Sequence, residues 1–159
     1  MTRRGQISLG LLAVVVLVLL TARFVVTPYI VVGDSMLPTL QSWELCLMAR
    51  TQHYEPMRGD VVMFGTADKP VLYFVKRVVA LPGETVAIVR GGVTINGKLL
   101  DEPYTTRNLS WDMPASIVPA EEVFVLGDNR DVALEATVHG MVATRLIEAR
   151  MLTHWRWKR

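Results

Sequence analysis

An apolar stretch near the N-terminus dominates the hydrophobic pattern of this chain. No charged residue occurs from Gly5 to Ala22, and Leu11–Leu20 is entirely apolar. A helix over this stretch would span roughly 27 Å, slightly less than the hydrocarbon core of a bilayer, which is roughly 30 Å thick. Extending the helix through Phe24–Val26, with the Arg23 side chain reaching toward the headgroups, would close that gap.

We therefore predict a transmembrane anchor with a short cytoplasmic tip over residues 1–26, followed by an extracytoplasmic domain over residues 27–159. A cleavable secretory signal is the alternative, since Arg3 and Arg4 would form its basic start. The sequence around Ala22 is a poor cleavage site, which favours the anchor. Arg3 and Arg4 then keep the N-terminus in the cytoplasm of a single-pass protein of the inner, cytoplasmic membrane, although Arg23 opposes this weakly.

Beyond this segment, short runs rich in Val, Ile, Tyr and Phe predict strands bounded by Gly, Pro, Asn or Asp. Asn96-Gly97 is the turn sequence of a two-residue β-hairpin. The stretch Thr105–Pro119 lacks periodicity and is expected to be a long loop. The predicted strands are Val61–Phe64, Val71–Leu81, Thr85–Val89, Val93–Ile95, Val123–Leu126 and Met141–Leu152. The pattern predicts a mostly β fold with antiparallel strands.

The C-terminal segment Thr153–Arg159 places Trp155 and Trp157 among basic residues. This mixture suits a lipid headgroup layer, so the bilayer is one expected contact. The alternative, which we favour, is a terminal strand whose tryptophans pack on the sheet.

Composition excludes several classes of function. The net charge of +2 is too small for a nucleic-acid-binding surface. Cys46 is the single cysteine, so an intrachain disulfide and a cysteine-based zinc site are both excluded. The three histidines are scattered along the chain, and we expect neither a metal site nor a cofactor.

Four strings of residues carry the candidate chemistry. They are Gly33-Asp34-Ser35-Met36-Leu37-Pro38-Thr39-Leu40, Arg58-Gly59-Asp60-Val61-Val62-Met63-Phe64, Tyr73–Glu84 and Gly127-Asp128-Asn129-Arg130-Asp131. In this order and spacing they resemble the motifs of the signal peptidase I family. Ile95–Lys98 with Glu102-Pro103-Tyr104 resembles the hairpin of that family. The resemblance covers residues 5–152 and implies a signal-peptidase-like β domain that cleaves signal peptides from exported preproteins.

The resemblance implies that Ser35 is the nucleophile of a serine endopeptidase and Lys76 its general base. Lysine accepts a proton only when neutral, and its usual pKa of about 10.4 leaves roughly one molecule in a thousand neutral near pH 7.4. Burial in an apolar wall would lower this pKa by about two to three units. Strand alternation puts Lys76 on one face with Phe74 and Val78, and Arg77 on the opposite face as a scaffold ion.

Supporting roles follow from the same resemblance. The backbone N–H of Ser35 would bind the oxyanion, and Gly33 would let the backbone approach the substrate closely. Asp34 should point away from Lys76, because a nearby carboxylate would raise the pKa of the lysine. The residues expected to line the substrate pocket are Met36, Leu40, Phe74 and Val75. The residues expected to form a scaffold are Asp128, Asn129, Arg130 and Asp131.

The chain departs from the family pattern after Asp131. Ala133 replaces a serine expected to hydrogen-bond the lysine amine, and Glu135 and Thr137 replace an Asp/Arg pair. Alternatives therefore stay open: a specialised peptidase with one or few clients, a weakly active paralogue, or a non-catalytic membrane-tethered domain that binds peptides by strand addition. The self-cleaving repressors of the SOS response share Ser–Lys chemistry, but they carry a DNA-binding domain where this chain has its apolar segment.

Overall fold

The computed structural model describes residues 11–12, 25–51, 54–66, 69–105, 109–131 and 140–156. Leu11, Leu12 and Val25 are helical. Within these ranges, no helix combines the length and the hydropathy needed to traverse a bilayer. The predicted anchor lies almost wholly outside the described residues and stays a prediction.

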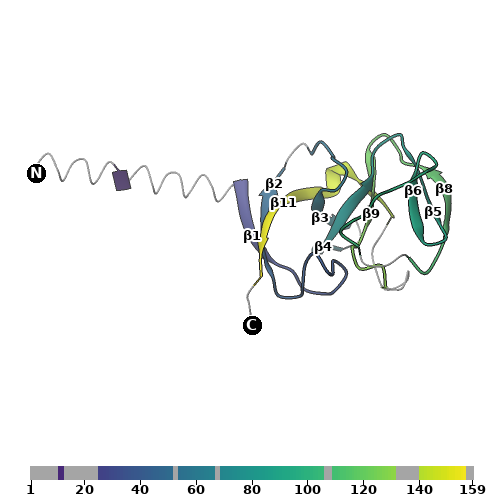
Figure 1. Ribbon diagram of the computed structural model, residues 1–159. Helices are drawn as coiled ribbons and strands as arrows, with labels where there is room; N and C mark the ends of the chain where they lie inside the picture. Colours follow the sequence, from purple (N-terminus) through teal and green to yellow (C-terminus); the bar gives the residue numbers. More distant parts are fainter. Residues whose placement is uncertain are drawn as a thin grey trace, which may run out of the picture.

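Two antiparallel sheets make up the described part of the domain (Figure 1). One sheet has seven strands in the order β1-β2-β11-β3-β4-β9-β10, and the other has four in the order β7-β6-β5-β8. The strands of the larger sheet are β1 Val26–Ile30, β2 Leu45–Arg50, β3 Val61–Thr66, β4 Lys69–Ala80, β9 Glu122–Leu126, β10 Gly140–Ala143 and β11 Ile147–Trp155, with the 3-10 helix η2 at Thr144–Leu146. The strands of the smaller sheet are β5 Thr85–Val89, β6 Gly92–Ile95, β7 Lys98–Leu99 and β8 Met113–Ile117.

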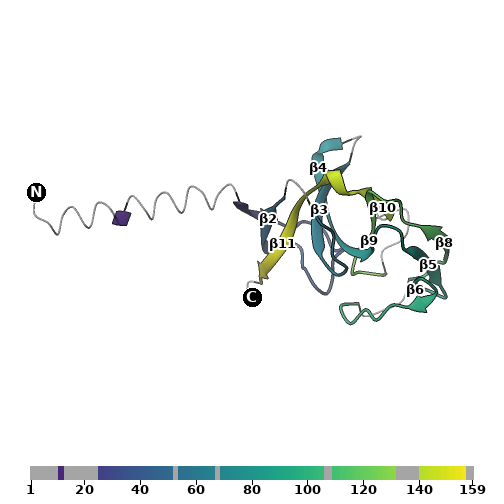
Figure 2. The same ribbon diagram turned by 90° about the horizontal axis from the view of Figure 1, so that it is seen from above.

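The long strand β4 connects the two parts of the domain. Its residues from Lys69 to Arg77 pair with β3, and its residues from Arg77 to Ala80 pair with β9. Figures 1 and 2 both place the smaller sheet at the end of the domain opposite β1 and β2. One apolar cluster bridges the sheets, because Val79 and Ala80 at the end of β4 pack with Val86 and Ile88 of β5.

Strand β3 of the larger sheet is buried on both faces, which explains its continuous apolar run. Val61 and Met63 belong to one core cluster and Val62 and Phe64 to another, although they alternate along β3. A strand covered on both sides needs apolar residues at every position rather than at every second one.

Most of the predicted strands are confirmed. The structure also contains strands that were not predicted, divides one predicted strand in two, and begins one strand at a residue that was expected to be helical. The unpredicted strands β1 and β2 pair with each other, and β2 also pairs with β11. Strand β8 lies inside the stretch predicted as a loop, where it pairs with β5. The run predicted over Met141–Leu152 is split by η2 into β10 and β11. Val26, which the sequence suggested as part of a helix, begins β1, since Pro28 disfavours helical geometry at the residue before it.

The predicted hairpin at Asn96-Gly97 is confirmed. Asn96 has a φ of 51° and Gly97 a φ of 78°, the two positive values that a tight two-residue turn requires. Strands β6 and β7 pair antiparallel on either side of it.

The start of the C-terminal segment belongs to a terminal strand, as predicted, because β11, the last strand along the chain, reaches Trp155. The Trp155 side chain is 64% exposed, however, so its predicted packing on the sheet is wrong. Trp157 lies outside the described residues.

Candidate active site

Lys76 lies in the middle of β4, opposite the fully buried Val62 of β3. Only 3% of Lys76 is exposed, as the predicted desolvating face requires. Burial lowers the pKa of Lys76 to about 8, and the negative charge of Asp128 opposes part of this effect. A substantial fraction of this amine is therefore neutral at mildly alkaline pH, which is the state a general base needs.

Ser35 lies in the loop between β1 and β2, and the segment after β9 holds this loop in place. The backbone N–H of Asn129 donates to the Ser35 carbonyl at 3.1 Å. The Asn129 side-chain amide donates to the Asp34 carbonyl at 2.9 Å. The Asp34 residue is exposed, and the carboxylate charge that acts on Lys76 is that of Asp128, in agreement with the prediction for Asp34.

Gly127 is the point where the Ser35 loop and Lys76 approach the end of β9. A Cβ atom at Gly127 would lie 2.3 Å from the Ser35 carbonyl oxygen and 3.5 Å from Lys76 Nζ. The first distance is far inside van der Waals contact, so only glycine lets these three segments come together. This close approach brings the predicted nucleophile loop beside the predicted base.

Ser35 and Lys76 line the same pocket, whose volume is about 140 Å³. Its other lining residues are Tyr29, Ile30, Val31, Val32, Met36, Met63, Tyr73, Phe74 and Val75. The pocket is thus a mostly apolar cleft, walled by β1 and the segment after it and by β3 and β4.

The predicted pocket residues divide into two groups. Met36, Phe74 and Val75 line the pocket that Ser35 and Lys76 also line, and their contact with substrate stays a prediction. Leu40 is instead fully buried in the core cluster beneath the loop, together with Met48 and Val61. Gly33 is exposed with a φ of +110° and donates its N–H to Ser42 Oγ at 3.0 Å, so it shapes the turn before Ser35 rather than the pocket wall.

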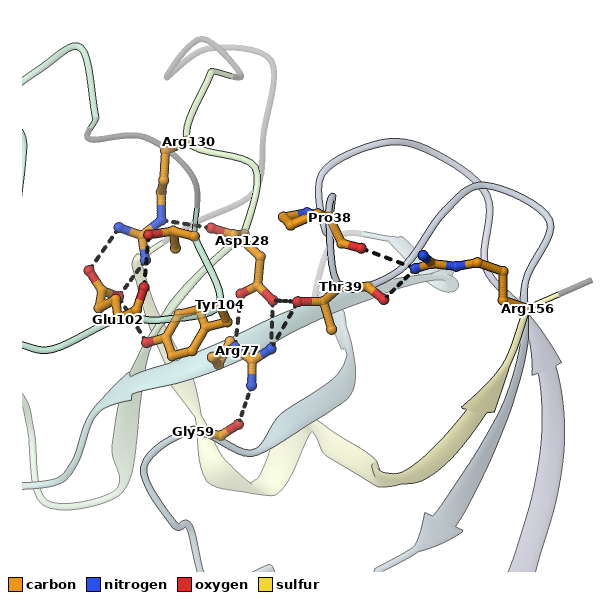
Figure 3. Close-up of polar contacts among 11 residues, drawn as sticks. Pro38, Thr39, Gly59, Arg77, Glu102, Tyr104, Asp128, Arg130 and Arg156 are labelled. Atoms are coloured by element: carbon orange, nitrogen blue, oxygen red, sulfur yellow. Dashed lines mark hydrogen bonds and ion pairs between the residues drawn. The ribbon is translucent and has the colours of Figure 1, made fainter. Parts of the chain in front are cut away.

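Asp128 and Arg77 form a buried ion pair next to the site (Figure 3). Arg77 donates from Nε to Asp128 Oδ1 at 2.8 Å and from Nη2 to Oδ2 at 2.6 Å. Thr39, in the Ser35 loop, donates its hydroxyl to Oδ2 at 2.5 Å, and Arg77 also donates to the Gly59 carbonyl at 2.7 Å. This pair therefore ties the strand that carries Lys76 to the loop that carries Ser35, which agrees with the scaffold role predicted for both residues.

A second ion pair continues this network toward the smaller sheet. Arg130 forms a two-pronged pair with Glu102, at 2.5 and 3.0 Å, and donates from Nε to the Gly127 carbonyl at 3.0 Å. The Tyr104 hydroxyl donates to Glu102 at 2.9 Å, and the Arg77 guanidinium lies 4.1 Å above the Tyr104 ring. Glu102 and Tyr104, in the segment that follows β7, thus contact both arginines (Figure 3).

Arg156, beyond the end of β11, holds the other side of the Ser35 loop. Its Nη2 donates to the carbonyls of Pro38 at 3.1 Å and Thr39 at 3.2 Å (Figure 3). Its Nε pairs with the buried Glu44. Burial raises the pKa of Glu44, but the hydrogen bond and charge of Arg156, together with a backbone hydrogen bond from Gln41, leave it below its usual range. At least one basic residue of the tail is therefore engaged with the domain.

The sequence reasoning missed the roles of Glu102, Tyr104 and Arg156. The first two belong to a motif that was noted, but its contact with Arg77 and Arg130 depends on how the smaller sheet packs. Asp131 contributes its backbone N–H to Asn129 Oδ1 at 3.1 Å, a scaffold contact. The substituted segment Val132–Thr137 lies outside the described residues. Among the described side chains, no cluster of three or more His, Cys, Asp or Glu is suited to a metal ion.

Comparison with known proteins identifies the family. The family model described as signal peptidase, peptidase S26, matches residues 4–157. Signal peptidase I S of Bacillus subtilis is 38% identical over 135 residues, which cover 77% of this chain and 72% of the relative. The probable signal peptidase I-1 of Synechocystis is 34% identical over 141 residues, covering 83% and 72% of the two chains. The crystal structure of a signal peptidase I from Enterococcus faecalis has a TM-score of 0.51 and 30% identity, covering 63% of this chain and 98% of that one. The chain therefore belongs to the signal peptidase family, peptidase S26.

Proposed function

We propose that this protein removes signal peptides from exported preproteins, with Ser35 as the nucleophile and Lys76 as the general base. The observation that carries the proposal is a buried lysine amine, with its pKa lowered to about 8, lining one pocket with a serine. A serine hydroxyl is a poor nucleophile until a base takes its proton. A neutral lysine in a dry wall is such a base.

The proposed reaction has two stages. The neutral Lys76 amine takes the Ser35 hydroxyl proton while Oγ attacks the carbonyl of the substrate residue before the cut. The resulting ammonium returns its proton to the leaving amine as the peptide bond breaks, which leaves an ester on Ser35. Lys76, neutral again, takes a proton from water while the water oxygen attacks the ester carbonyl. The ammonium then returns this proton to Ser35 Oγ as the ester bond breaks, which releases the acid and restores the neutral amine.

Stabilisation of the oxyanion is assigned to the backbone N–H of Ser35. Gly33 has no side chain that could add a second donor. The Asn129 side-chain amide donates to the Asp34 carbonyl at 2.9 Å, and this carbonyl belongs to the same peptide unit as the Ser35 N–H, which supports a fixed orientation of that donor. Preorganised donors of this kind are typically worth a hundredfold to a thousandfold in rate, so this fixed orientation is part of the proposed mechanism.

The size of the pocket fits small substrate side chains. An apolar cavity of roughly 150 Å³ holds a single benzene molecule. A pocket of about 140 Å³ walled by Met36, Phe74 and Val75 therefore has room for one medium side chain or two small ones. This supports a preference for small residues one and three positions before the cut, which the resemblance to signal peptidase I implies.

The proposed location is the outer surface of the cytoplasmic membrane, with the N-terminus in the cytoplasm. The apolar segment Gly5–Ala22 and the basic pair Arg3 and Arg4 support it. The substrate's own apolar segment lies in the same bilayer. A shared membrane would raise the effective concentration of enzyme near its substrate.

Cleavage of preproteins by the purified full-length chain in detergent micelles tests the proposal. We expect a preprotein with alanine one and three residues before the cut to be processed, and its variant with tryptophan next to the cut to be spared. The Ser35→Ala chain is expected to bind the first preprotein without cleaving it. Equal processing by wild type and Ser35→Ala would contradict the proposal, and binding without cleavage by the wild type would identify a peptide-binding domain instead.

A specialised processing peptidase is the second candidate, favoured by the substituted segment Val132–Thr137. A panel of unrelated preproteins separates the two. Processing of many members indicates a general signal peptidase, whereas processing of one or few indicates the specialist.

Replacing Gly127 by alanine is expected to lower kcat/KM by about a hundredfold, because the new methyl group would displace the Ser35 carbonyl and misalign the attacking hydroxyl. Gly65→Ala is the matched control, since its methyl group would meet a Tyr73 ring carbon at an ordinary 3.9 Å. Initial rates of preprotein cleavage measure both variants. A Gly127→Ala enzyme as active as Gly65→Ala would show that the close approach at Gly127 is not needed for the reaction.

A further inference from the structure

A second, larger pocket adjoins the pocket that holds Ser35 and Lys76. Its volume is about 690 Å³, and it shares Tyr29 and Met63 with the smaller pocket. Its other lining residues are Val25, Arg50, Thr51, Arg145, Ile147 and Glu148. The two pockets are therefore neighbours, and the larger one lies on the side of β1 away from Ser35.

Tyr73 links the two pockets chemically as well. Tyr73 lines the smaller pocket, and Glu148 lines the larger one. The negative charge of Glu148 raises the pKa of the Tyr73 hydroxyl, and the hydrogen bond between the two side chains acts in the same direction. The positive charge of Arg50 acts on the same hydroxyl in the opposite direction. Glu148 and Arg50 thus lie where the two pockets meet.

The charge of the larger pocket is positive. Arg50 and Arg145 supply two guanidinium groups. Glu148 supplies one carboxylate, and part of its hydrogen-bonding capacity is used by Tyr73. The surplus charge and the planar donors of two arginines suit a carboxylate or an amide oxygen.

The position of the pocket indicates which part of a substrate would reach it. Val25, which lines the pocket, directly follows the apolar N-terminal segment and precedes β1. A preprotein whose own apolar segment lies in the bilayer must pass from this end of β1 toward Ser35. The substrate residues before the cut therefore enter the larger pocket first and the smaller pocket next.

The length of β1 sets the distance from the cut. Tyr29 lies six residues before Ser35 in the chain, and extended peptides advance roughly 3.3 Å per residue. The turn at Gly33 makes the direct path shorter than six extended residues. An extended substrate beside this segment therefore places a side chain at most about six positions before the cut at the larger pocket.

We propose that the larger pocket is an upstream subsite that favours signal peptides carrying an acidic or amide side chain roughly five or six positions before the cut. This inference rests on the proposed function. It assigns Arg50 and Arg145 as specificity-determining residues that contact the substrate and take no part in bond cleavage.

The test compares two preproteins that differ at these two positions alone, with aspartate in one and lysine in the other. Wild-type chain in neutral detergent is expected to cleave the aspartate substrate about fivefold to thirtyfold faster in kcat/KM, and 0.5 M salt is expected to weaken this preference. Arg50→Glu and Arg145→Glu should each reduce the preference, and together reverse it. Lys98→Glu, the same charge change on an exposed residue of β7, is the matched control and should leave it unchanged.

The outcomes separate the two proposals. Equal cleavage of both substrates by wild type and by both arginine variants overturns the subsite. A loss with Arg50→Glu that is the same for both substrates, and that appears only in vesicles containing anionic phospholipid, also overturns it and points to a lipid phosphate. If the wild type cleaves neither substrate, the proposed cleavage function fails. The affinities of the Ser35→Ala chain for the two uncleaved preproteins then decide the subsite, with equal affinities overturning it.

Discussion

Replacing Lys76 by alanine should lower kcat/KM for a preprotein by about a thousandfold or more while the domain stays folded. General bases typically contribute a hundredfold to ten-thousandfold in rate, and the Lys76 amine lines the Ser35 pocket. The variant also loses the proton that the leaving amine requires. Lys98→Ala, which removes an exposed amine of β7, is the control and should cleave at the wild-type rate. Undiminished cleavage by Lys76→Ala would refute the assigned base.

The pH dependence of the wild-type enzyme should carry the signature of the same amine. Burial lowers the pKa of Lys76 to about 8, and the neutral form is the active one. The value of kcat/KM should therefore rise tenfold per pH unit below pH 8 and level off above it. Initial cleavage rates between pH 6 and pH 10 measure this profile. A profile that keeps rising to pH 10 would mean that the pKa of the base is not lowered, which contradicts the desolvation of Lys76.

Stability provides an independent measure of the same burial. The pKa of Lys76 is lower in the folded chain, so the unfolded chain binds this proton more strongly. The resulting penalty is complete below about pH 8 and disappears above pH 10.5, the unshifted value. Lys76→Met should thus be inactive yet more stable by about 3 kcal/mol at pH 6 to 7, with the difference vanishing above pH 10.5. Chemical unfolding at several pH values measures this, and lower stability of Lys76→Met at pH 7 would contradict it.

The strand runs could be read from the sequence because burial on one or both faces leaves a local pattern. Val61–Phe64 reads as a continuous apolar run, since both faces of β3 are covered. The turn at Asn96-Gly97 needs two positive φ values, and its two residue types are those that adopt them.

The strands that the sequence missed lack such a local signal. Strand β8 contains Pro114 and has mostly exposed residues, and it is a strand because its backbone pairs with β5. Strand β1 follows the apolar N-terminal segment without a break in hydrophobicity, so no composition change marks where the helix signal ends. In both cases pairing with a distant strand decides the structure, and local residue preference does not.

The candidate site divides in the same way. Ser35, Lys76 and the Gly127–Asp131 segment were recognisable as motifs, because their chemistry depends on residue type. The contacts of Arg156 with the Ser35 loop and of Tyr104 with Arg77 join residues far apart in the chain. No periodicity encodes such contacts, since they arise from the way the two sheets and the C-terminal end of β11 come together.

Replacing Asp128 by asparagine should destabilise the domain by about 3–5 kcal/mol and shift the pH profile of cleavage to lower pH. The Asp128 side chain is fully buried and the Arg77 side chain is 11% exposed, so the variant would leave an arginine charge buried without its partner. Removing one member of a buried pair typically costs this much, because the desolvation of the remaining charge is no longer offset. Chemical unfolding at pH 7.5 measures the loss.

The shift in pH arises from a different property of the same carboxylate. The negative charge of Asp128 raises the pKa of Lys76 against the larger effect of burial. Neutralising it leaves burial unopposed, so the pKa of Lys76 should fall below its wild-type value and the activity midpoint should move with it. The maximal rate should fall tenfold to a hundredfold at the same time, because the carboxylate that joins Thr39 of the Ser35 loop to Arg77 of β4 is lost.

Thr39→Val separates the charge from the hydrogen bonds. It removes the hydroxyl that donates to Asp128, which should cost about 1 kcal/mol of stability, and it leaves every charge in place. Its activity midpoint should therefore coincide with that of the wild type, whereas that of Asp128→Asn should lie lower. If both variants share the wild-type midpoint, the charge of Asp128 does not reach the Lys76 amine. If both midpoints shift equally, the loop geometry sets the pKa of the base and the carboxylate charge does not.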